Sequence, residues 1–317
     1  MTDTFGRNIR YLRLSVTDLC NLRCRYCMPA EGVCKKRHEE MLTEEEMVQA
    51  VRAAASLGVE KLRLTGGEPL VKKNILSICE QCAAVPGIQE VCMTTNGTLL
   101  PQMARRLREA GVYRLNISLD TLDPEKYTWI TRTGALDQAL QGIEAALEAG
   151  FEHLKINAVL IGGFNDREIP ALAELTRRWP IDVRFIELMP MTQQEIFMPQ
   201  AYLSGAAVLS ALPELIPVEQ DGGVAELYRL PGAQGRIGII HAVSRHFCAA
   251  CNCIRLTADG LLKPCLHSGQ ELSIKGLDYE GMRQEIMRAI ASKPACHPPL
   301  SAAERSCAGR DMNQIGG

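Results

Sequence analysis

Short apolar runs alternate with longer amphipathic segments over the first two thirds of the chain, and this alternation constrains the fold more than any other feature. The short runs are typical of strands and lie at residues 11–16, 61–64, 91–94, 114–119, 154–160 and 182–188. Helices are expected at residues 43–57, 75–84, 103–110, 137–149 and 167–178. Strands that alternate with helices pair in parallel through right-handed crossovers. The sequence therefore predicts an α/β fold, an incomplete (β/α)6 TIM-like barrel.

Helix boundaries in this region carry their usual signals. Thr43 and Glu46 form the S/T-x-x-E capping box at the start of the first helix. Gly58, Gly111 and Gly150 follow the predicted C-terminal ends of three helices, where glycine commonly occupies the left-handed cap position. These signals support the predicted order of helices and strands.

The alternation loosens after Pro190, and a glycine-rich stretch follows between residues 222 and 238. We therefore expect a boundary near residue 225, with a partial barrel over residues 1–225 and a C-terminal region over residues 226–317. Residues 258–260 (Ala-Asp-Gly) have the composition of a hairpin turn. Such a hairpin would bring together cysteines on either side of it.

Composition excludes several classes of protein. A net charge of −2 gives no overall field that would attract nucleic acid or an anionic membrane. No apolar run approaches about 18 residues, so no transmembrane helix is expected, and the polar N-terminus lacks the apolar centre of a signal peptide. The 13 cysteines are therefore expected to be reduced, in the cytoplasm.

Six of the cysteines form two triplets. Cys20, Cys24 and Cys27 have the spacing C-x3-C-x2-C, and the second triplet has the spacing C-x2-C-x13-C, being Cys248, Cys251 and Cys265. Close thiolates suit iron–sulfur clusters, and three protein ligands leave one iron of a four-iron cube open. Zinc is the alternative for the first triplet, with Cys34 or His38 as the nearest candidates for the fourth ligand that structural zinc takes. Another close pair, Cys79 and Cys82, lies at helical spacing among apolar residues and is expected to pack in a helix.

Unusual residues follow most of the predicted strands. The first triplet follows strand one, a Thr-Gly-Gly-Glu-Pro run follows strand two at residues 65–69, and polar residues end strands three and four. Barrel enzymes place their chemistry on the loops at the C-terminal ends of their strands. The sequence therefore predicts one site at this edge.

The first triplet, with Tyr26 before its last cysteine, and the Gly66-Gly67-Glu68-Pro69 run resemble the radical S-adenosylmethionine superfamily. The resemblance implies a [4Fe–4S] cluster on Cys20, Cys24 and Cys27 whose open iron binds S-adenosylmethionine, the source of a 5′-deoxyadenosyl radical. It also implies contacts to S-adenosylmethionine from four residues, namely Tyr26, Gly67, Ser118 and Met189. Glu68 is expected to order the loop.

The surroundings of the second triplet narrow the resemblance further. The runs at residues 246–252, 254–260 and 264–266, together with residues 13–18 and the Gly316-Gly317 tail, resemble the GTP 3′,8-cyclase family over essentially the whole chain. This implies a second [4Fe–4S] cluster on Cys248, Cys251 and Cys265 that binds the guanine of GTP. The radical would abstract the ribose C3′ hydrogen, and C3′ would then attack guanine C8. That reaction is the first step of molybdenum cofactor biosynthesis.

The resemblance also assigns roles to residues and partners. Arg13, Arg255, Gly316 and Gly317 are implied in catalysis. The implied GTP contacts are Arg13, Arg63, Thr94, Lys155, Cys253, Ile254 and Arg255. A reductant protein such as flavodoxin or ferredoxin would supply the electron, and cyclic pyranopterin monophosphate synthase would act downstream. We expect a monomer or homodimer that binds neither nucleic acid nor membrane.

One position departs from the family pattern. Cys253 stands where family members usually carry arginine, so a charge facing the phosphates is missing or is supplied by Arg245 or Lys263. Two other functions stay open from the residues alone. One is a radical enzyme that modifies a peptide, and the other is an interaction protein with structural zinc.

Overall fold

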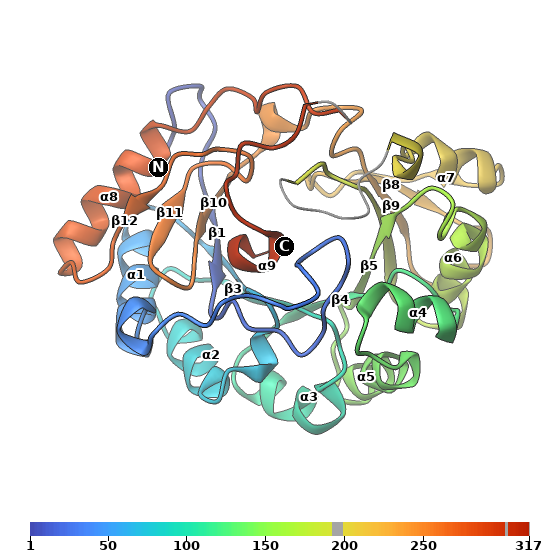
Figure 1. Cartoon of the computed structure of the whole chain (residues 1–317), viewed down its shortest axis with the longest axis horizontal. Helices are drawn as coiled ribbons and strands as arrows, with labels where there is room; N and C mark the ends of the chain where they lie inside the picture. The colour runs from blue at the N-terminus through green and yellow to red at the C-terminus, as the bar shows by residue number, and fades with distance from the viewer. Residues whose placement is uncertain (192–198, 302–303, 317) are drawn as a thin grey trace.

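Six parallel strands form the centre of a curved sheet in the computed structural model, which describes residues 1–191, 199–301 and 304–316 (Figure 1). They are β1 (Tyr11–Ser15), β2 (Lys61–Thr65), β3 (Glu90–Thr95), β4 (Arg114–Ser118), β5 (Lys155–Leu160) and β6 (Asp182–Glu187). Each pairs in parallel with the next along the chain. The predicted α/β fold with six strands is therefore confirmed.

The last third of the chain extends this sheet at both ends. At one end β10 (Cys253–Leu256) pairs in parallel with β1, and β11 (Leu261–Lys263) and β12 (Leu272–Ser273) follow in antiparallel. At the other end β9 (Ile237–Ile240) pairs in parallel with β6, and β8 (Glu226–Arg229) and β7 (Ile216–Pro217) follow. Within the described ranges β12 and β7 are the sheet edges, so hydrogen bonds do not close the barrel. The domain boundary near residue 225 stays a prediction.

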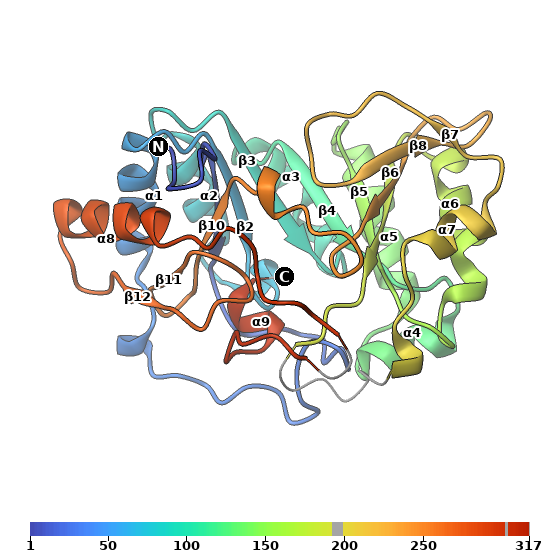
Figure 2. The same cartoon turned by 90° about the horizontal axis from the view of Figure 1, so that it is seen from above.

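Helices cover the outer face of the sheet (Figures 1 and 2). The longer ones are α1 (Glu44–Ser56), α2 (Ile75–Ala83), α3 (Leu100–Glu109), α5 (Leu136–Glu148), α6 (Ile169–Arg178) and α8 (Tyr279–Ala291). The shorter ones are α4 (Pro124–Thr131) and α7 (Ala206–Ala211), with 3-10 turns at His38–Glu40, Pro69–Val71, Asp166–Glu168, Pro199–Ala201 and Cys248–Ala250. The short helix α9 (Met312–Ile315) lies inside the curve of the sheet instead (Figure 1). In the described part of the chain, no helix combines the length and apolar character that crossing a membrane requires.

The predicted helix signals act as expected. Thr43 Oγ1 accepts a hydrogen bond from Glu46 N at 3.2 Å, and Glu46 Oε2 accepts one from Thr43 N at 2.9 Å. Gly58, with φ of +91°, ends α1 in the left-handed region. α3 starts at Leu100, three residues before the predicted start, because Pro101 suits the first turn of a helix. The sequence pattern missed α4, α7, α8 and α9.

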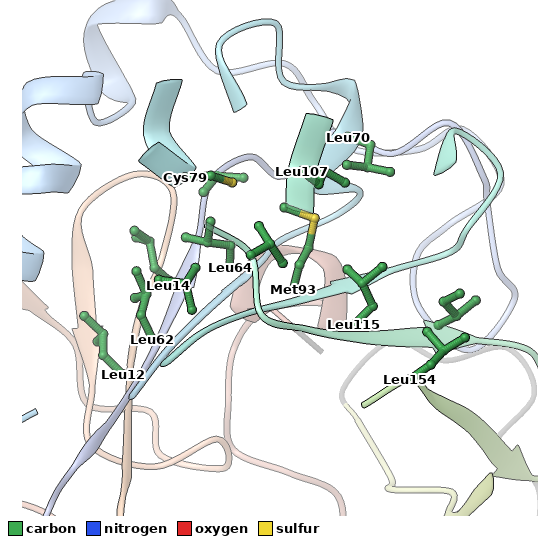
Figure 3. Close-up of a cluster of buried hydrophobic side chains, with 14 of the residues drawn as sticks. Leu12, Leu14, Leu62, Leu64, Leu70, Cys79, Met93, Leu107, Leu115 and Leu154 are labelled. Carbon is green, nitrogen blue, oxygen red and sulfur yellow. The ribbon is translucent and has the colours of Figure 1, made fainter. Parts of the chain in front are cut away.

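Alternation along the strands gives the sheet two different faces. Leu12, Leu14, Leu62 and Leu64 are buried against the helices and join the main core, to which α2 contributes Cys79 (Figure 3). Complete burial of a leucine side chain contributes about 1.5–3 kcal/mol. The residues between these leucines point to the inner face, where the sheet carries polar side chains. The predicted packing role of Cys79 and Cys82 is confirmed, since both are fully buried in α2.

Candidate functional site

Cationic side chains line the inner face of the sheet. Arg255 on β10, Arg13 on β1 and Arg63 on β2 occupy neighbouring positions in one register row. Farther along the sheet, Lys155 on β5 stands beside Asn116 on β4, and Arg184 on β6 stands beside Asn157 on β5. We call Arg13, Arg63, Lys155, Arg184 and Arg255 the inner cation row.

Two members of the row are held in one hydrogen-bonded group with Tyr11 and Thr94. Arg63 Nε donates to Tyr11 Oη at 2.6 Å, and Arg13 Nη1 donates to the same oxygen at 3.1 Å. Arg63 Nη1 also donates to Thr94 Oγ1 at 3.3 Å. The structure therefore brings together Arg13, Arg63 and Thr94, which the sequence analysis had grouped.

Burial and repulsion from neighbouring cations lower the pKa values of three members of the row, Arg255, Lys155 and Arg184. Burial, with Arg13 next to it, lowers the pKa of Arg255 to about 10. Burial and then Arg184 lower the pKa of Lys155 to about 8, although Lys155 Nζ lies 3.6 Å from the Asp182 carboxylate. Burial also lowers the pKa of Arg184. A bound polyanion would relieve the repulsion, so the row has the chemistry of a phosphate site.

Arg184 is a candidate functional residue that the sequence analysis missed. Among the described residues, its Nε is one of eight buried side-chain atoms without a hydrogen-bond partner, and Asn116 Oδ1, Asn157 Oδ1 and Ser15 Oγ are others. Buried polar atoms that lack a protein partner point to a ligand or water. The alternation of apolar Val183 and Phe185 around Arg184 was the sequence signal that could have placed it on the inner face.

The first cysteine triplet lies on the loop after β1. Its thiols are free and half-buried, and Cys27 N donates to Cys24 O at 2.9 Å within a tight turn. Burial raises the pKa of Cys20 to about 11, and it raises the pKa values of Cys24 and Cys27 further. Because metals bind the thiolate, these groups lose their protons only to a strongly bound cationic centre.

The spread of the sulfur atoms decides which centre fits. In the described residues only one group of three or more metal-binding side chains has all its ligand atoms within 4.8 Å, and it is neither cysteine triplet. A tetrahedral zinc ion with bonds of about 2.3 Å would draw three Sγ atoms to within about 4.6 Å of one another. The sulfur atoms of each triplet are therefore spread more widely than around a single zinc ion, and this spread suits a larger, multi-iron cluster.

The Gly66-Gly67 pair closes the β2 loop against the first triplet's loop. Gly67 N donates to Thr17 O at 2.8 Å, and a Cβ on Gly67 would lie 2.3 Å from Leu19 O. The close approach that these glycines allow is thus made by the protein's own backbone. Glu68 orders the loop as predicted, since its carboxylate accepts from Thr95 Oγ1 at 2.7 Å and from Asn96 N at 2.7 Å. Burial raises the pKa of Glu68 to about 7.

The remaining predicted contacts for S-adenosylmethionine come from three other segments. Tyr26 Oη donates to Asp120 Oδ2 at 2.7 Å, which holds the ring beside the end of β4, where Ser118 is the last strand residue. Burial raises the pKa of Asp120 to about 6. Met189 packs against a small cluster with Met191 and Ile315, so it touches the C-terminal tail.

The second triplet is assembled around the β10–β11 hairpin. Cys251 precedes β10, Cys265 follows β11, and Cys248 begins the short 3-10 turn before them. β10 and β11 pair in antiparallel, with Arg255 opposite Lys263, so the predicted hairpin is confirmed. Cys265 also lies close enough to Arg255 to influence its pKa. The second triplet therefore borders the inner cation row.

The residues of β10 itself divide between the two faces. Cys253 lies on the same side as Arg255 and close to Arg13, and burial raises its pKa. Ile254 is buried in the hydrophobic core, so its side chain points away from the inner face.

The two residues suggested as substitutes for the missing arginine charge, Lys263 and Arg245, are bound to other groups. Lys263 Nζ donates to Ser268 O at 2.7 Å, and Arg245 pairs with Glu226 at 2.7 Å.

The C-terminal tail lies in the middle of the half-barrel (Figures 1 and 2). Gly316 O accepts hydrogen bonds from Arg255 Nη1 and, at 3.5 Å, from Arg13 Nη2. A Cβ on Gly316 would lie 2.5 Å from Thr65 Cγ2, which explains why glycine is needed there. Asn313 Nδ2 donates to Asp18 O at 2.9 Å, so α9 also contacts the first triplet's loop. Gly317 lies outside the described residues.

Comparisons with known proteins agree with this geometry. The chain matches the radical SAM superfamily over residues 14–176 and the family described as Molybdenum Cofactor Synthesis C over residues 181–298. A protein named GTP 3′,8-cyclase from Alkaliphilus oremlandii is 46% identical over 323 residues, covering 100% of both chains. One of the same name from Pelotomaculum thermopropionicum is 48% identical over 328 residues, again covering 100% of both.

Solved structures show the same fold at low identity. Streptococcus suis SuiB matches with a TM-score of 0.63 and 15% identity, over 87% of this chain and 68% of SuiB. Methylornithine synthase matches with a TM-score of 0.52 and 19% identity, over 66% of this chain and 63% of that chain. At these identities the likeness establishes the fold and no more.

Proposed function

Because the chain belongs to the GTP 3′,8-cyclase family of the radical SAM superfamily, we propose that its inner cation row binds the triphosphate of GTP. The family converts GTP to (8S)-3′,8-cyclo-7,8-dihydroguanosine 5′-triphosphate, the first step of molybdenum cofactor biosynthesis. The observation that carries the proposal is the row of buried cations beside the second cysteine triplet, with unpartnered polar atoms around it.

The row supplies charge at spaced positions along one sheet face. Arg13, Arg63 and Arg255 offer planar guanidinium groups that can each hold two phosphate oxygens, and Lys155 adds a point charge. Arg184, on β6, adds a further cation beside Asn157. Thr94 Oγ1 lies within this group through its bond to Arg63.

Cys20, Cys24 and Cys27 would hold the first [4Fe–4S] cluster. When bound there, the cluster and S-adenosylmethionine supply the 5′-deoxyadenosyl radical that abstracts the ribose C3′ hydrogen. Tyr26, Gly67, Ser118 and Met189 would position S-adenosylmethionine. Gly67 acts by letting the β2 loop close against the first triplet's loop, and Tyr26 is oriented by Asp120.

Cys248, Cys251 and Cys265 would hold the second cluster, which would bind the guanine of GTP. The second triplet lies beside Arg255. This position supports a binding mode in which the cluster would hold the guanine and the inner cation row would hold the triphosphate. Cys253 faces the same side, and its buried thiol adds no charge there. Ile254 would contact GTP through its main chain, because its side chain lies in the core.

The C-terminal tail links the two halves of the site. Gly316 binds the Arg13 and Arg255 guanidinium groups through its carbonyl oxygen, which orients both side chains before substrate arrives. We assign Gly316 to this positioning role, and Gly317 stays a catalytic residue that the resemblance implies. Deleting both residues is expected to lower cyclisation, and unchanged product formation would remove the assignment.

The remaining assignments concern the cell. A flavodoxin or ferredoxin would reduce the first cluster, and cyclic pyranopterin monophosphate synthase would consume the product. The 13 free cysteines fit a reducing cytoplasm. We expect a monomer or homodimer.

Anaerobic incubation with GTP, S-adenosylmethionine and a reductant tests the proposal. Both 5′-deoxyadenosine and a cyclised nucleotide are expected, with about eight irons per chain from two four-iron clusters. Formation of 5′-deoxyadenosine without a cyclised nucleotide would reject GTP as the substrate, and peptides would then be the next candidates.

A further inference from the structure

Two imidazoles lie beside one cysteine of the second triplet. The ligand atoms of His246, Cys248 and His297 all lie within 4.8 Å of one another, the only group of this kind in the described part of the chain. His246 and His297 are 51 positions apart: the first lies in the segment before β10, and the second follows α8. Neither histidine is assigned to GTP or S-adenosylmethionine.

His297 is already oriented in the way that metal-binding histidines are. Its Nδ1 lies 2.7 Å from Pro298 O, and because a carbonyl oxygen only accepts, Nδ1 carries the proton. The lone pair is therefore on Nε2, which faces His246 Nδ1 at 3.0 Å. A backbone carbonyl on the other ring nitrogen is the usual second partner of a metal-binding histidine. His297 is buried, so this orientation is held by its surroundings.

A third imidazole supports the arrangement from behind. The His267 ring lies 4.7 Å from the His297 ring, and its Nδ1 is 2.9 Å from Ser306 Oγ. His267 does not belong to the compact group, so it packs against His297 and offers no ligand atom. The exposed His246 is the ligand that can turn to complete the site.

We propose that His246, Cys248 and His297 bind one divalent ion of the zinc type when the second cluster is absent. One thiolate and two imidazoles are a ligand set that zinc takes, with bonds of about 2.0–2.3 Å. Three ligand atoms within 4.8 Å need only small movements to reach one ion. Water would complete the tetrahedron.

The ion and the second cluster compete for Cys248. This part of the inference rests on the proposed function, because it assumes that Cys248 is a cluster ligand. One sulfur cannot serve a zinc ion and an iron of the cluster in their separate positions. Zinc bound first would therefore block assembly of the second cluster and leave the first unaffected.

Cobalt(II) titration under anaerobic, reducing conditions tests the site alone. The full-length, cluster-free chain would carry Cys20→Ala, Cys24→Ala, Cys27→Ala, Cys251→Ala and Cys265→Ala, so that Cys248 is the one triplet thiol left. We expect one tightly bound cobalt per chain, with one thiolate-to-cobalt charge-transfer band that Zn²⁺ abolishes by displacement. Adding Cys248→Ala should remove the band.

The histidines give the sharper test. His246→Ala and His297→Ala should each weaken cobalt binding about tenfold or more. His153→Ala is the matched control, since His153 is an exposed histidine whose ring contacts Tyr113 elsewhere on the surface. Equal affinity in the parent, His246→Ala and His297→Ala would overturn the proposal, as would an absence of one-to-one binding in a variant that circular dichroism shows to be folded.

A second measurement covers the case in which the five-alanine chain does not fold. Cluster-free chain with all its native cysteines would be loaded with Zn²⁺ and then reconstituted with iron and sulfide. We expect zinc to lower iron incorporation in the parent and in His153→Ala more than in the His246→Ala/His297→Ala double variant. Equal inhibition in all three would overturn the proposal. A chain that binds cobalt through both histidines but does not cyclise GTP would retain this site and reject the proposed function instead.

Discussion

The two cysteine triplets have the same number of ligands but different surroundings. The first lies on one loop, and burial raises the pKa values of all its thiols. The second is gathered around a hairpin, beside the Arg255 guanidinium and within reach of two imidazoles. The first environment suits a cluster shielded from water and competing ligands. By our proposals, the second leaves its centre next to the charges of the substrate and open to other metals.

The largest expected effects come from replacing one cysteine in each triplet, because the two substitutions should abolish different products. Cys24→Ala should abolish 5′-deoxyadenosine formation, because the first triplet would hold the cluster that binds S-adenosylmethionine. Cys251→Ala should abolish cyclisation while some cleavage of S-adenosylmethionine remains. Each variant should lose about four irons. Chromatography of both products checks this, and loss of 5′-deoxyadenosine in Cys251→Ala would remove the functional difference between the triplets.

The affinity for the charged triphosphate of GTP should depend on the residues around the second triplet. Arg255→Ala is expected to weaken GTP binding by about 1.5–3 kcal/mol, the usual contribution of a hydrogen bond to a charged group. Equilibrium dialysis with the cluster-loaded protein would measure this. Arg245→Ala is the control, because Arg245 is exposed and paired with Glu226. Equal effects of the two substitutions would show that the row does not hold the triphosphate.

The packing of the β2 loop against the first triplet's loop should depend on Gly67. A Cβ there would lie 2.3 Å from Leu19 O, and crowding of this kind typically costs about 1–3 kcal/mol. Urea denaturation of Gly67→Ala should show this loss of the free energy of unfolding. Gly163→Ala, where φ is +73° and no atom lies within 4 Å, should lose about 1–2 kcal/mol from backbone strain alone. A larger loss at Gly163 than at Gly67 would contradict the steric argument.

The inner cation row should make GTP binding sensitive to pH. Lys155 has a pKa of about 8 in the ligand-free protein, so it is charged below pH 8 and increasingly neutral above it. A triphosphate binds the charged form, and affinity should therefore fall as pH rises, by up to about tenfold between pH 7 and pH 9. Lys155→Arg should flatten this dependence, because a guanidinium keeps its proton across that range. An unchanged slope would assign the pH effect to another group.

The smallest expected effect concerns a cysteine outside both triplets. Cys82→Ala in α2 should lower the free energy of unfolding by about 1 kcal/mol, since it removes one buried sulfur from the core. Iron content and product formation should not change. A loss of iron would mean that a third group of cysteines takes part in cluster binding.

The first triplet and the helix boundaries could be predicted from the sequence because each depends on residues that are close together along the chain. Cys20, Cys24 and Cys27 lie within one loop, and the capping box at Thr43 and the glycine at position 58 act within a few residues of a helix end. The alternation of Val183, Arg184 and Phe185 would also have placed Arg184 on the inner face, had it been applied to strand six.

The second environment depends on contacts between distant segments. Pairing of β10 with β1 brings Arg255 beside Arg13, and α9 brings Gly316 to both. Contacts between distant segments also explain three other features of this region. Lys263 and Arg245 are bound to other groups, Ile254 is buried in the core, and His246 contacts His297.

The sequence by itself determined the strand and helix order, the inward and outward alternation, and the two cysteine spacings, because each follows from residues that are neighbours along the chain. The tertiary structure alone decided which end of the sheet receives β10, where the tail lies and which cations share a face. Those choices come from burying apolar surface and pairing strand edges across the whole chain, so no short segment encodes them.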